Sequence, residues 1–210
     1  MKFFKKSILI IILLFIYISI CTISYVNAVS KNIQNSVFRL HVIANSNEDY
    51  DQNLKYIVRN SILEFINTNC KNKSKDEIIS YTTENIAEIQ KVAQSTIINN
   101  GYNYPVKVNI GNFAFPTKKY GDITFPSGFY DALKIEIGKA QGENWWCVMF
   151  PPLCFVDVTS GIVPEESKET LKQNLSTEEY NILSENSNEF KVKFKIVEMF
   201  QNLNIKIAKN

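Results

Sequence analysis

The N-terminal segment constrains this chain most, because it joins a cationic start to a long uncharged apolar run. Three lysines within the first six positions precede residues 8–25, and the small-x-small tripeptide Val26-Asn27-Ala28 follows. At about 18 residues, the run exceeds an ordinary signal-peptide core and approaches the length that crosses a bilayer. We expect residues 1–28 to be a signal peptide or an N-terminal membrane anchor. Both place the rest of the chain outside the cytoplasm, because the lysines stay inside.

The charge of the remaining chain argues against nucleic-acid binding. Lys and Arg number 23 and Asp and Glu 21, so removing the three leader lysines leaves a net charge of −1. Such a body lacks the basic field that nucleic acids require. The 210 residues suit one domain, with residues 29–36 as a short linker and 37–210 as a single folded unit.

Hydrophobic periodicity predicts a strand and two helices at the start of this unit. Residues 37–44 alternate with period two, which places Arg39 and His41 on the face opposite the apolar side chains. Residues 51–69 carry apolar side chains at helical spacing. Ser74 and Glu77 match a capping box, which opens a second helix that ends near residues 100–101.

The second half of the chain is predicted to consist mainly of strands. Residues 106–110 and 133–137 alternate, and residues 145–150 form an apolar run typical of a central strand covered on both faces. Residues 111–128, rich in Pro and Gly, are expected to be a long surface loop. Together these elements predict an α+β fold, with a mixed or mostly antiparallel sheet and the two N-terminal helices packed on one face.

The C-terminal region offers two further patterns. Ser176 and Glu179 match another capping box, which predicts a short helix. Residues 190–196 alternate apolar side chains with Lys191, Lys193 and Lys195, which predicts a half-buried strand with a solvated lysine face. Contact of these lysines with anionic lipid heads is the alternative.

Three cysteines follow the leader. Cys147 and Cys154 flank a short loop with two prolines, and export permits a disulfide between them. Cys70 is left over, so it is either free or paired with another chain. A cysteine nucleophile needs a base, and His41 is the one histidine in the sequence. Nucleophilic catalysis is therefore disfavoured.

The sequence offers little support for an enzyme. A lone histidine cannot build a His-rich zinc site, and no cysteine pair has zinc-ligand spacing. His41 as a general base would need an orienting carboxylate, for which Asp49 and Asp51 are conceivable. No phosphate loop, nucleophile elbow or metalloprotease motif occurs. We expect no catalytic residues, no cofactor, no metal and no small-molecule substrate.

Adjacent tryptophans on an apolar strand point to opposite faces, so one of Trp145 and Trp146 should lie in the core. An exposed tryptophan beside a Pro-Pro turn is typical of an interface anchor.

Three segments resemble the stage II sporulation protein R family. They are residues 38–46 (FRLHVIANS) with the following Asp51-Gln52, residues 125–133 (FPSGFYDAL) and residues 144–154 (NWWCVMFPPLC). The likeness extends over about residues 37–200, and the motifs are long and unusual.

The resemblance implies an exported intercellular signalling protein of sporulation, made in the forespore. It would act in the space between forespore and mother cell, near the membrane or anchored to it. There it would activate a membrane-embedded aspartic protease, stage II sporulation protein GA, which leads to processing of pro-sigma-E. The resemblance implies that this chain is the ligand and that the protease chemistry resides in its partner, so no catalytic residues are carried over.

The candidate partner-binding residues lie on the polar face of the first strand, the following turn and helix start, and the Trp-Trp turn. They are Arg39, His41, Asn45, Asp51, Gln52, Lys55, Arg59, Trp145 and Trp146. An internal ion-pair network among Arg39, Asp51 and Arg59 is an equal alternative. The competing functions are an extracytoplasmic cell-wall hydrolase, and a membrane-anchored structural component of sporulation.

Overall fold

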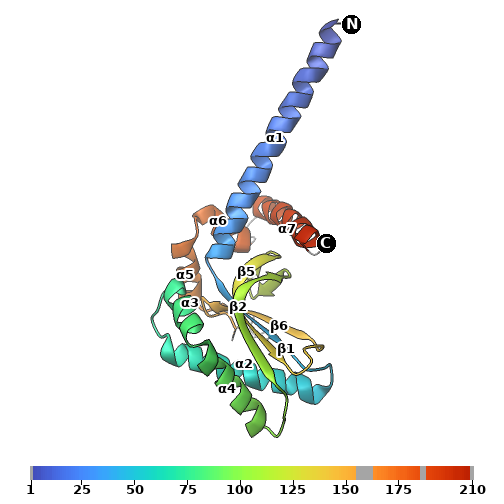
Figure 1. The fold of residues 1–210 in the computed structure, drawn as a ribbon. Helices are drawn as coiled ribbons and strands as arrows, with labels where there is room; N and C mark the ends of the chain where they lie inside the picture. The colour runs from blue at the N-terminus through green and yellow to red at the C-terminus, as the bar shows by residue number, and fades with distance from the viewer. Residues whose placement is uncertain (1, 155–162, 185–187, 209–210) are drawn as a thin grey trace.

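The structure, a computed structural model, describes residues 2–154, 163–184 and 188–208 (Figure 1). Its helices and strands follow one another as α1 (Lys2–Asn35), β1 (Phe38–Ile43), α2 (Asp49–Asn69), α3 (Lys75–Glu84), α4 (Ile86–Asn99), β2 (Val106–Phe115), β3 (Lys118–Tyr120), β4 (Ile123–Phe125), β5 (Gly128–Ile137), β6 (Asn144–Phe150), α5 (Glu165–Asn174), α6 (Thr177–Ser184) and α7 (Asn188–Ala208).

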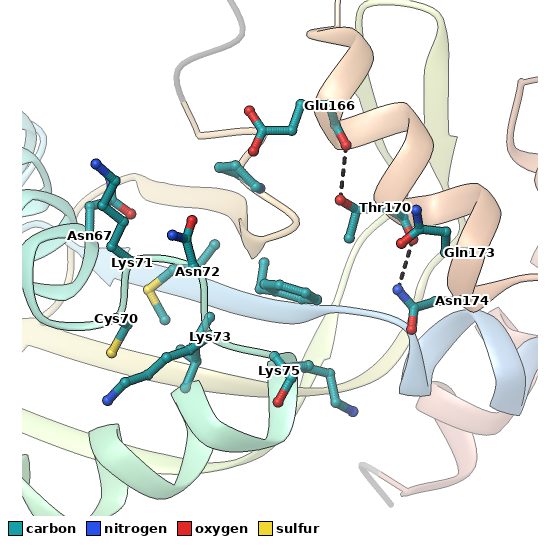
Figure 2. A pocket seen from close by; sticks show the side chains of 15 residues that line it. Asn67, Cys70, Lys71, Asn72, Lys73, Lys75, Glu166, Thr170, Gln173 and Asn174 are labelled. Carbon is teal, nitrogen blue, oxygen red and sulfur yellow. Dashed lines mark hydrogen bonds between the residues drawn. The ribbon is translucent and has the colours of Figure 1, made fainter.

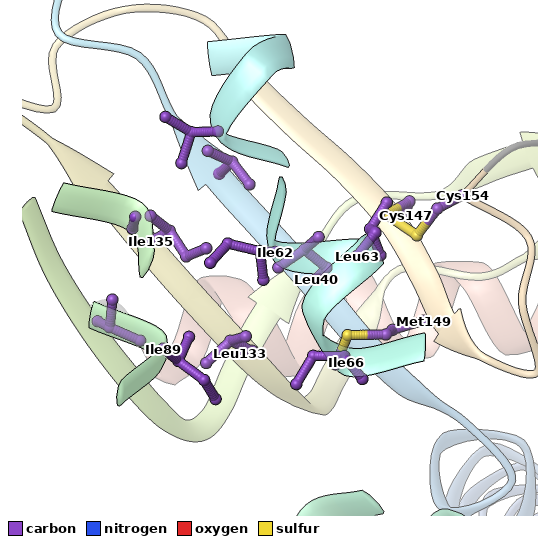
Figure 3. Packing of buried hydrophobic residues seen from close by; sticks show 14 of the residues in the cluster. Leu40, Ile62, Leu63, Ile66, Ile89, Leu133, Ile135, Cys147, Met149 and Cys154 are labelled. Carbon is purple, nitrogen blue, oxygen red and sulfur yellow. A yellow bond between two sulfur atoms is a disulfide. The ribbon is translucent and has the colours of Figure 1, made fainter. Parts of the chain in front are cut away.

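A four-stranded mixed sheet organises the body, in the order β2-β5-β1-β6. The central strand β1 pairs parallel with β5 and antiparallel with β6. Helices α2 and α4 pack on one face of the sheet, where the aliphatic side chains of Figure 3 meet. The α+β class and the placement of the two N-terminal helices on one face are thus confirmed.

The second face of the sheet is covered as well. Residues of α1, α5, α6, α7 and the β3–β4 hairpin form a second hydrophobic cluster there. All six residues of β1 are consequently buried. The polar side of β1, which carries the candidate partner-binding residues Arg39 and His41, is covered by the hairpin and the C-terminal helices.

The helical predictions at 51–69 and at the Ser74 capping box are confirmed, with both capping-box bonds formed. The second helix is divided at Asn85, however. The Asn85 side-chain amide donates to the carbonyl oxygen of Tyr81, at 2.8 Å, and so competes with the helical backbone pattern. The Ser176–Glu179 capping box also forms, at the start of α6.

Two predictions for the strands are wrong. Residues 111–128 extend β2 and then form the hairpin β3–β4, because Phe115, Ile123 and Phe125 bury their side chains against the second face. Strand β6 is apolar on both sides as expected, but it lies at the edge of the sheet and not in its centre.

The predicted strand at 190–196 is part of the 21-residue helix α7. Phe194, Val197 and Gln201 are buried at helical spacing, whereas Val192 points to solvent. The local alternation of lysine and apolar residues concealed this longer period.

Helix α1 projects from the body (Figure 1). Its apolar residues up to Tyr25 are exposed, and by length and composition it can cross a membrane. Residues 29–36, expected to be a linker, continue the helix to Asn35. Val26, Val29 and Ile33 are buried in the second cluster, so the lower end of α1 belongs to the body.

Candidate partner-binding surface

The two tryptophans of β6 face opposite sides of the sheet. Trp145 lies beside α2, with its ring centroid 5.4 Å from that of Tyr56 and 4.2 Å from the Arg59 guanidinium carbon. Trp146 stacks on the His41 imidazole with the ring centroids 3.6 Å apart. Both tryptophans are half-buried, so neither is the fully buried core residue that the alternation predicts.

A hollow of about 460 Å³ opens between the tryptophans and the β3–β4 hairpin. Lys118 and Lys119 line it on one side, and the Cys147–Cys154 region lines it on the other. We call Tyr56, Arg59, Lys118, Lys119, Trp145 and Trp146 the tryptophan surface. It combines aromatic rings with cations, the residue types that dominate binding energy at protein interfaces.

The edge of β6 beside this hollow is partly closed. The Tyr120 hydroxyl donates to the carbonyl oxygen of Trp146 (3.1 Å), and the Leu153 amide donates to the carbonyl oxygen of Val148 (3.0 Å). Occupied edge carbonyls disfavour the addition of a partner strand. A partner would therefore meet side chains here.

A larger hollow of about 790 Å³ lies elsewhere, between the α2–α3 turn and α5 (Figure 2). Figure 2 shows Lys71, Lys73 and Lys75 on one side of it and Gln173 and Asn174 on the other. None of the partner-binding residues expected from the sequence lines it.

Arg39 is fully buried beneath the β3–β4 hairpin, on the same side of the sheet as Trp146. Its guanidinium donates to the Tyr120 hydroxyl at 2.9 Å and lies 4.2 Å and 4.7 Å from the ring centroids of Phe115 and Tyr130. Within the described residues it forms no ion pair. Aromatic faces take the place of a counter-ion. Arg39 therefore supports the sheet and cannot itself touch a partner.

His41 is also buried, at 5% exposure. Its Nε2 donates to the Asn144 side-chain oxygen, 2.6 Å away. Burial lowers the pKa of His41 to about 4, so the imidazole is neutral at pH 7. In the described part of the chain, Asp51 bonds to Asn45 and Ser46 and not to this ring. The arrangement does not favour His41 as a general base.

The buried His41 predicts a loss of stability in mild acid. The pKa of His41 is lower in the folded state than its ordinary 6.5, so the unfolded chain binds the proton more tightly. The stabilisation is complete above pH 6.5 and falls as the pH approaches 4, by about 2 kcal/mol at pH 5. Urea unfolding of the full chain in mild detergent at pH 7.5 and pH 5 measures this loss. His41→Gln should show a smaller loss; an equal loss in that variant would assign the pH dependence to other groups.

The turn after β1 is a structural joint. Asp51 is buried at the first turn of α2, where its Oδ2 accepts from the Asn45 amide (2.7 Å) and the Ser46 hydroxyl (2.6 Å). The Asn45 side-chain oxygen in turn accepts from the backbone amide of Lys139, at 2.9 Å. These bonds tie the end of β1 to the start of α2 and to the loop after β5.

Lys55 and Gln52 extend this joint. The buried Lys55 ammonium donates to the Gln52 side-chain oxygen (2.5 Å) and to the carbonyl oxygen of Glu143 (3.2 Å). Burial lowers the pKa of Lys55. The backbone of Ser46 also lies close to Gly142: a Cβ atom on residue 142 would collide with the carbonyl oxygen of Ser46. Asn45, Asp51, Gln52 and Lys55 thus hold the loop that precedes Trp145, which is a positioning role.

Replacing Asp51 by alanine is expected to lower the free energy of unfolding by about 2 kcal/mol, because it removes a buried acceptor and leaves two half-buried donors without it. The matched control is Asp49→Ala, since Asp49 occupies the same helical turn but is exposed. The control should change the free energy of unfolding by less than about 0.5 kcal/mol. Equal effects of the two substitutions in urea unfolding would assign the loss to the helix dipole.

Within the described residues, Arg39, Asp51 and Arg59 do not form the ion-pair network that was the alternative. Asp51 does fix the junction of strand and helix, but through amide and hydroxyl donors. Arg59 lies on the tryptophan surface, where its guanidinium donates to the Asn60 side chain (2.9 and 2.7 Å). Arg39 bonds on the opposite face of the sheet.

The disulfide expected between Cys147 and Cys154 is present. Cys147 and Cys154 form a disulfide, with their Cα atoms 5.1 Å apart, beside the core residues of Figure 3. This bond suits an extracytoplasmic protein. Cys70 is a buried free thiol, and burial raises its pKa.

Several residues of this region were not predicted from the sequence. Tyr56 lies three residues before Arg59 on α2, so helical spacing could have revealed it. Lys118, Lys119 and Tyr120 belong to a segment that was expected to be a loop, and no local signal places them beside the tryptophans. In the part of the chain that the structure describes, no cluster of three or more His, Cys, Asp or Glu side chains could hold a metal ion.

Comparison with known proteins places these motifs in a family. The family model described as stage II sporulation protein R matches residues 34–160. Stage II sporulation protein R of Bacillus subtilis (strain 168) is 38% identical over 144 residues, which cover 67% of this chain and 64% of that protein. The chain thus spans just under two thirds of this relative. No solved structure matches significantly. The matched region contains β1, the joint and the tryptophans, and the chain belongs to the stage II sporulation protein R family.

Proposed function

We propose that this chain is an exported intercellular signal of sporulation that activates the membrane-embedded aspartic protease stage II sporulation protein GA. Activation of that protease would lead to processing of pro-sigma-E in the mother cell. Membership of the stage II sporulation protein R family carries this proposal. The exposed apolar part of α1 and the Cys147–Cys154 disulfide support export.

The signal acts in the space between forespore and mother cell. Export from the forespore leaves the leader lysines inside and the body outside. The body then meets the mother-cell membrane and the extracytoplasmic part of the protease. If the leader is removed after Ala28, Val29 and Ile33 still pack against the body; if α1 is retained as an anchor, Val26 packs there as well.

The tryptophan surface is the proposed contact with the protease. Trp145 and Arg59 are its anchors, because both are half-buried and Arg59 lies over the Trp145 ring. Half-buried rings at the centre of an interface lose their remaining contact with water on binding. Lys118 and Lys119, beside the hollow, favour an acidic segment of the partner.

Activation by contact requires only that the chain binds the active state of the protease more tightly than its inactive state. A preference of about 3 kcal/mol would shift the equilibrium between the two states more than a hundredfold. The rigid joint that carries β6 suits such a task, because an ordered surface loses little entropy on binding.

Two other functions give different results in simple experiments. If the chain were a cell-wall hydrolase that depends on His41, the purified wild-type chain would release peptidoglycan fragments. The folded His41→Ala variant would not release them. A structural component would leave pro-sigma-E processing unchanged when its gene is deleted. Neither has a specific observation in its favour here.

The proposal is tested by complementation of a sporulating bacterium that lacks its own copy of the protein. The full chain, together with its cognate protease, should restore pro-sigma-E cleavage on immunoblots. A protease with its catalytic aspartates replaced should abolish the restored cleavage. Absence of cleavage, despite verified export of the chain and expression of the cognate protease, would overturn the proposal.

A further inference from the structure

Helix α7 has two apolar faces on opposite sides. One face, with Phe194 and Val197, is buried against the body. The other carries Val192, Met199, Leu203 and Ile207, with Ile196, which is partly packed against the second cluster, between them; together they form one stripe. Four members of this stripe are between 49% and 72% exposed. The side of a surface helix that faces away from the body ordinarily carries polar residues. The exposed apolar stripe of α7 therefore indicates contact with another apolar surface.

Helix α7 begins beside the point where α1 leaves the body. The Tyr25 hydroxyl donates to Glu178 Oε1 at 2.8 Å, and the Lys193 ammonium donates to the same oxygen at 2.6 Å. Further along α7, Gln201 accepts from the Gln34 side-chain amide at 3.3 Å. Two contacts along its length therefore fix the orientation of α7 relative to α1.

The exposure of the α1 side chains indicates where along this helix the surface of a membrane would lie. The side chains from Ile8 to Tyr25 are mostly exposed and apolar, and Val26 is the first residue that the body buries completely. At 1.5 Å per residue, this stretch spans about 27 Å, close to the hydrocarbon thickness of a bilayer. Tyrosine is a usual residue at the membrane interface. Tyr25 thus marks the bilayer surface, and Figure 1 shows α7 crosswise to α1 at this end of the body.

The charges beside the stripe suit an anionic lipid surface. Helix α7 contains four lysines and two glutamates, a net charge of +2. Lys195 and Lys206 lie along one side of the stripe and Lys193 lies along the other, by helical geometry. Lys193 and Lys195 also pair with Glu178 and Glu198, so contact with lipid phosphates would be shared with or exchanged for these carboxylates. Lysine stems can cover apolar surface while the ammonium groups reach lipid phosphates.

We propose that α7 lies on the outer surface of the membrane that α1 crosses, with its exposed stripe in the boundary between headgroups and acyl chains. Helices with this distribution of apolar and basic residues bind in the plane of the interface. The pair of helices would fix the body against the bilayer, so that it could not rotate freely about α1. This inference depends on α1 entering a membrane and not on the identity of the protease.

Depth measurements on the full chain test the proposal. The chain carries Cys21→Ser and Cys70→Ala, keeps its disulfide, and receives one fluorescent label at Leu203→Cys or Ile207→Cys. It is reconstituted in vesicles of phosphatidylethanolamine and phosphatidylglycerol that contain nitroxide-labelled lipids. Asn202→Cys and Asn204→Cys are the matched controls, because both positions are exposed and flank the stripe.

Labels at 203 and 207 should be quenched by the lipid nitroxide about threefold more than labels at 202 and 204, and less by aqueous iodide. Equal quenching at all four positions would overturn the proposal. So would labels at 203 and 207 that are shielded from iodide but untouched by lipid nitroxides, since that result indicates a protein partner such as a second copy. All labelled positions are exposed. Because Cys70 is buried, thermal unfolding of the common Cys21→Ser, Cys70→Ala background is compared with that of the wild-type chain before labelling.

Discussion

Replacing Arg39 by alanine is expected to lower the free energy of unfolding by about 4 kcal/mol. The substitution leaves a cavity between Phe115 and Tyr130, and it removes the donor to the buried Tyr120 hydroxyl. Urea unfolding of the full chain in mild detergent, followed by tryptophan fluorescence, measures the change. The comparison with wild type is made at pH 7.5, where His41 is neutral in both.

Two further variants separate the charge of Arg39 from its volume. Arg39→Lys keeps the charge, but its compact ammonium cannot stack on the rings in the same plane, so a buried cation is left poorly compensated. Arg39→Met fills most of the volume without a charge and should be less costly than lysine by about 1–2 kcal/mol. A lysine variant as stable as wild type would contradict the role of the aromatic rings as counter-ion.

Replacing Trp145 by alanine is expected to reduce pro-sigma-E processing about 30-fold, which corresponds to a loss of about 2 kcal/mol in binding. Trp145 supplies the ring over which Arg59 lies, and it borders the hollow beside the hairpin. Arg59→Ala should also lower processing, by a smaller factor. Both are measured by immunoblot of pro-sigma-E in the complemented strain.

A matched control distinguishes this surface from aromatic residues in general. Tyr50 is 52% exposed and stacks on Tyr102 away from the tryptophan surface. Tyr50→Ala should leave processing unchanged. Because Trp145→Ala also removes packing against α2, export and thermal unfolding are checked for each variant. Normal processing by a well-exported Trp145→Ala chain would remove Trp145 from the proposed contact.

The N-terminal half of the fold could be predicted closely because its signals are local. The period-two pattern of β1, the helical spacing of α2 and the Ser74–Glu77 capping box each act within a few residues. The disulfide could be predicted for the same reason, since a short Pro-Pro turn keeps Cys147 and Cys154 close.

The rest depended on contacts between distant segments. Local sequence shows that Arg39 alternates with apolar neighbours, but it does not show that the hairpin and Tyr120 cover that side of β1. In α7 the lysine alternation matched a strand over seven residues, and tertiary packing selected the helix. The candidate surface was predicted only in part for the same reason. Its tryptophans and Arg59 were anticipated, whereas Lys118 and Lys119 were not.

This distinction also explains the roles of the motif residues. Asn45, Asp51, Gln52 and Lys55 are polar and follow a strand end, which is equally typical of a binding site and of a joint. Their bonds to one another and to the loop at 138–143 identify a joint. The polar residues of this motif therefore position the tryptophan surface, and Trp145 with Arg59 remains the part proposed to touch the partner.

The proposed signalling role is tested most directly by reconstitution of the protease and pro-sigma-E in vesicles. The full chain is supplied from the extracytoplasmic side in a second population of vesicles. Cleavage of pro-sigma-E should begin when wild-type chain is added, should be strongly reduced with Trp145→Ala, and should be absent with a catalytically inactive protease. Cleavage at the same rate without the chain, or no cleavage with folded chain and a protease shown to be active, would contradict activation by contact.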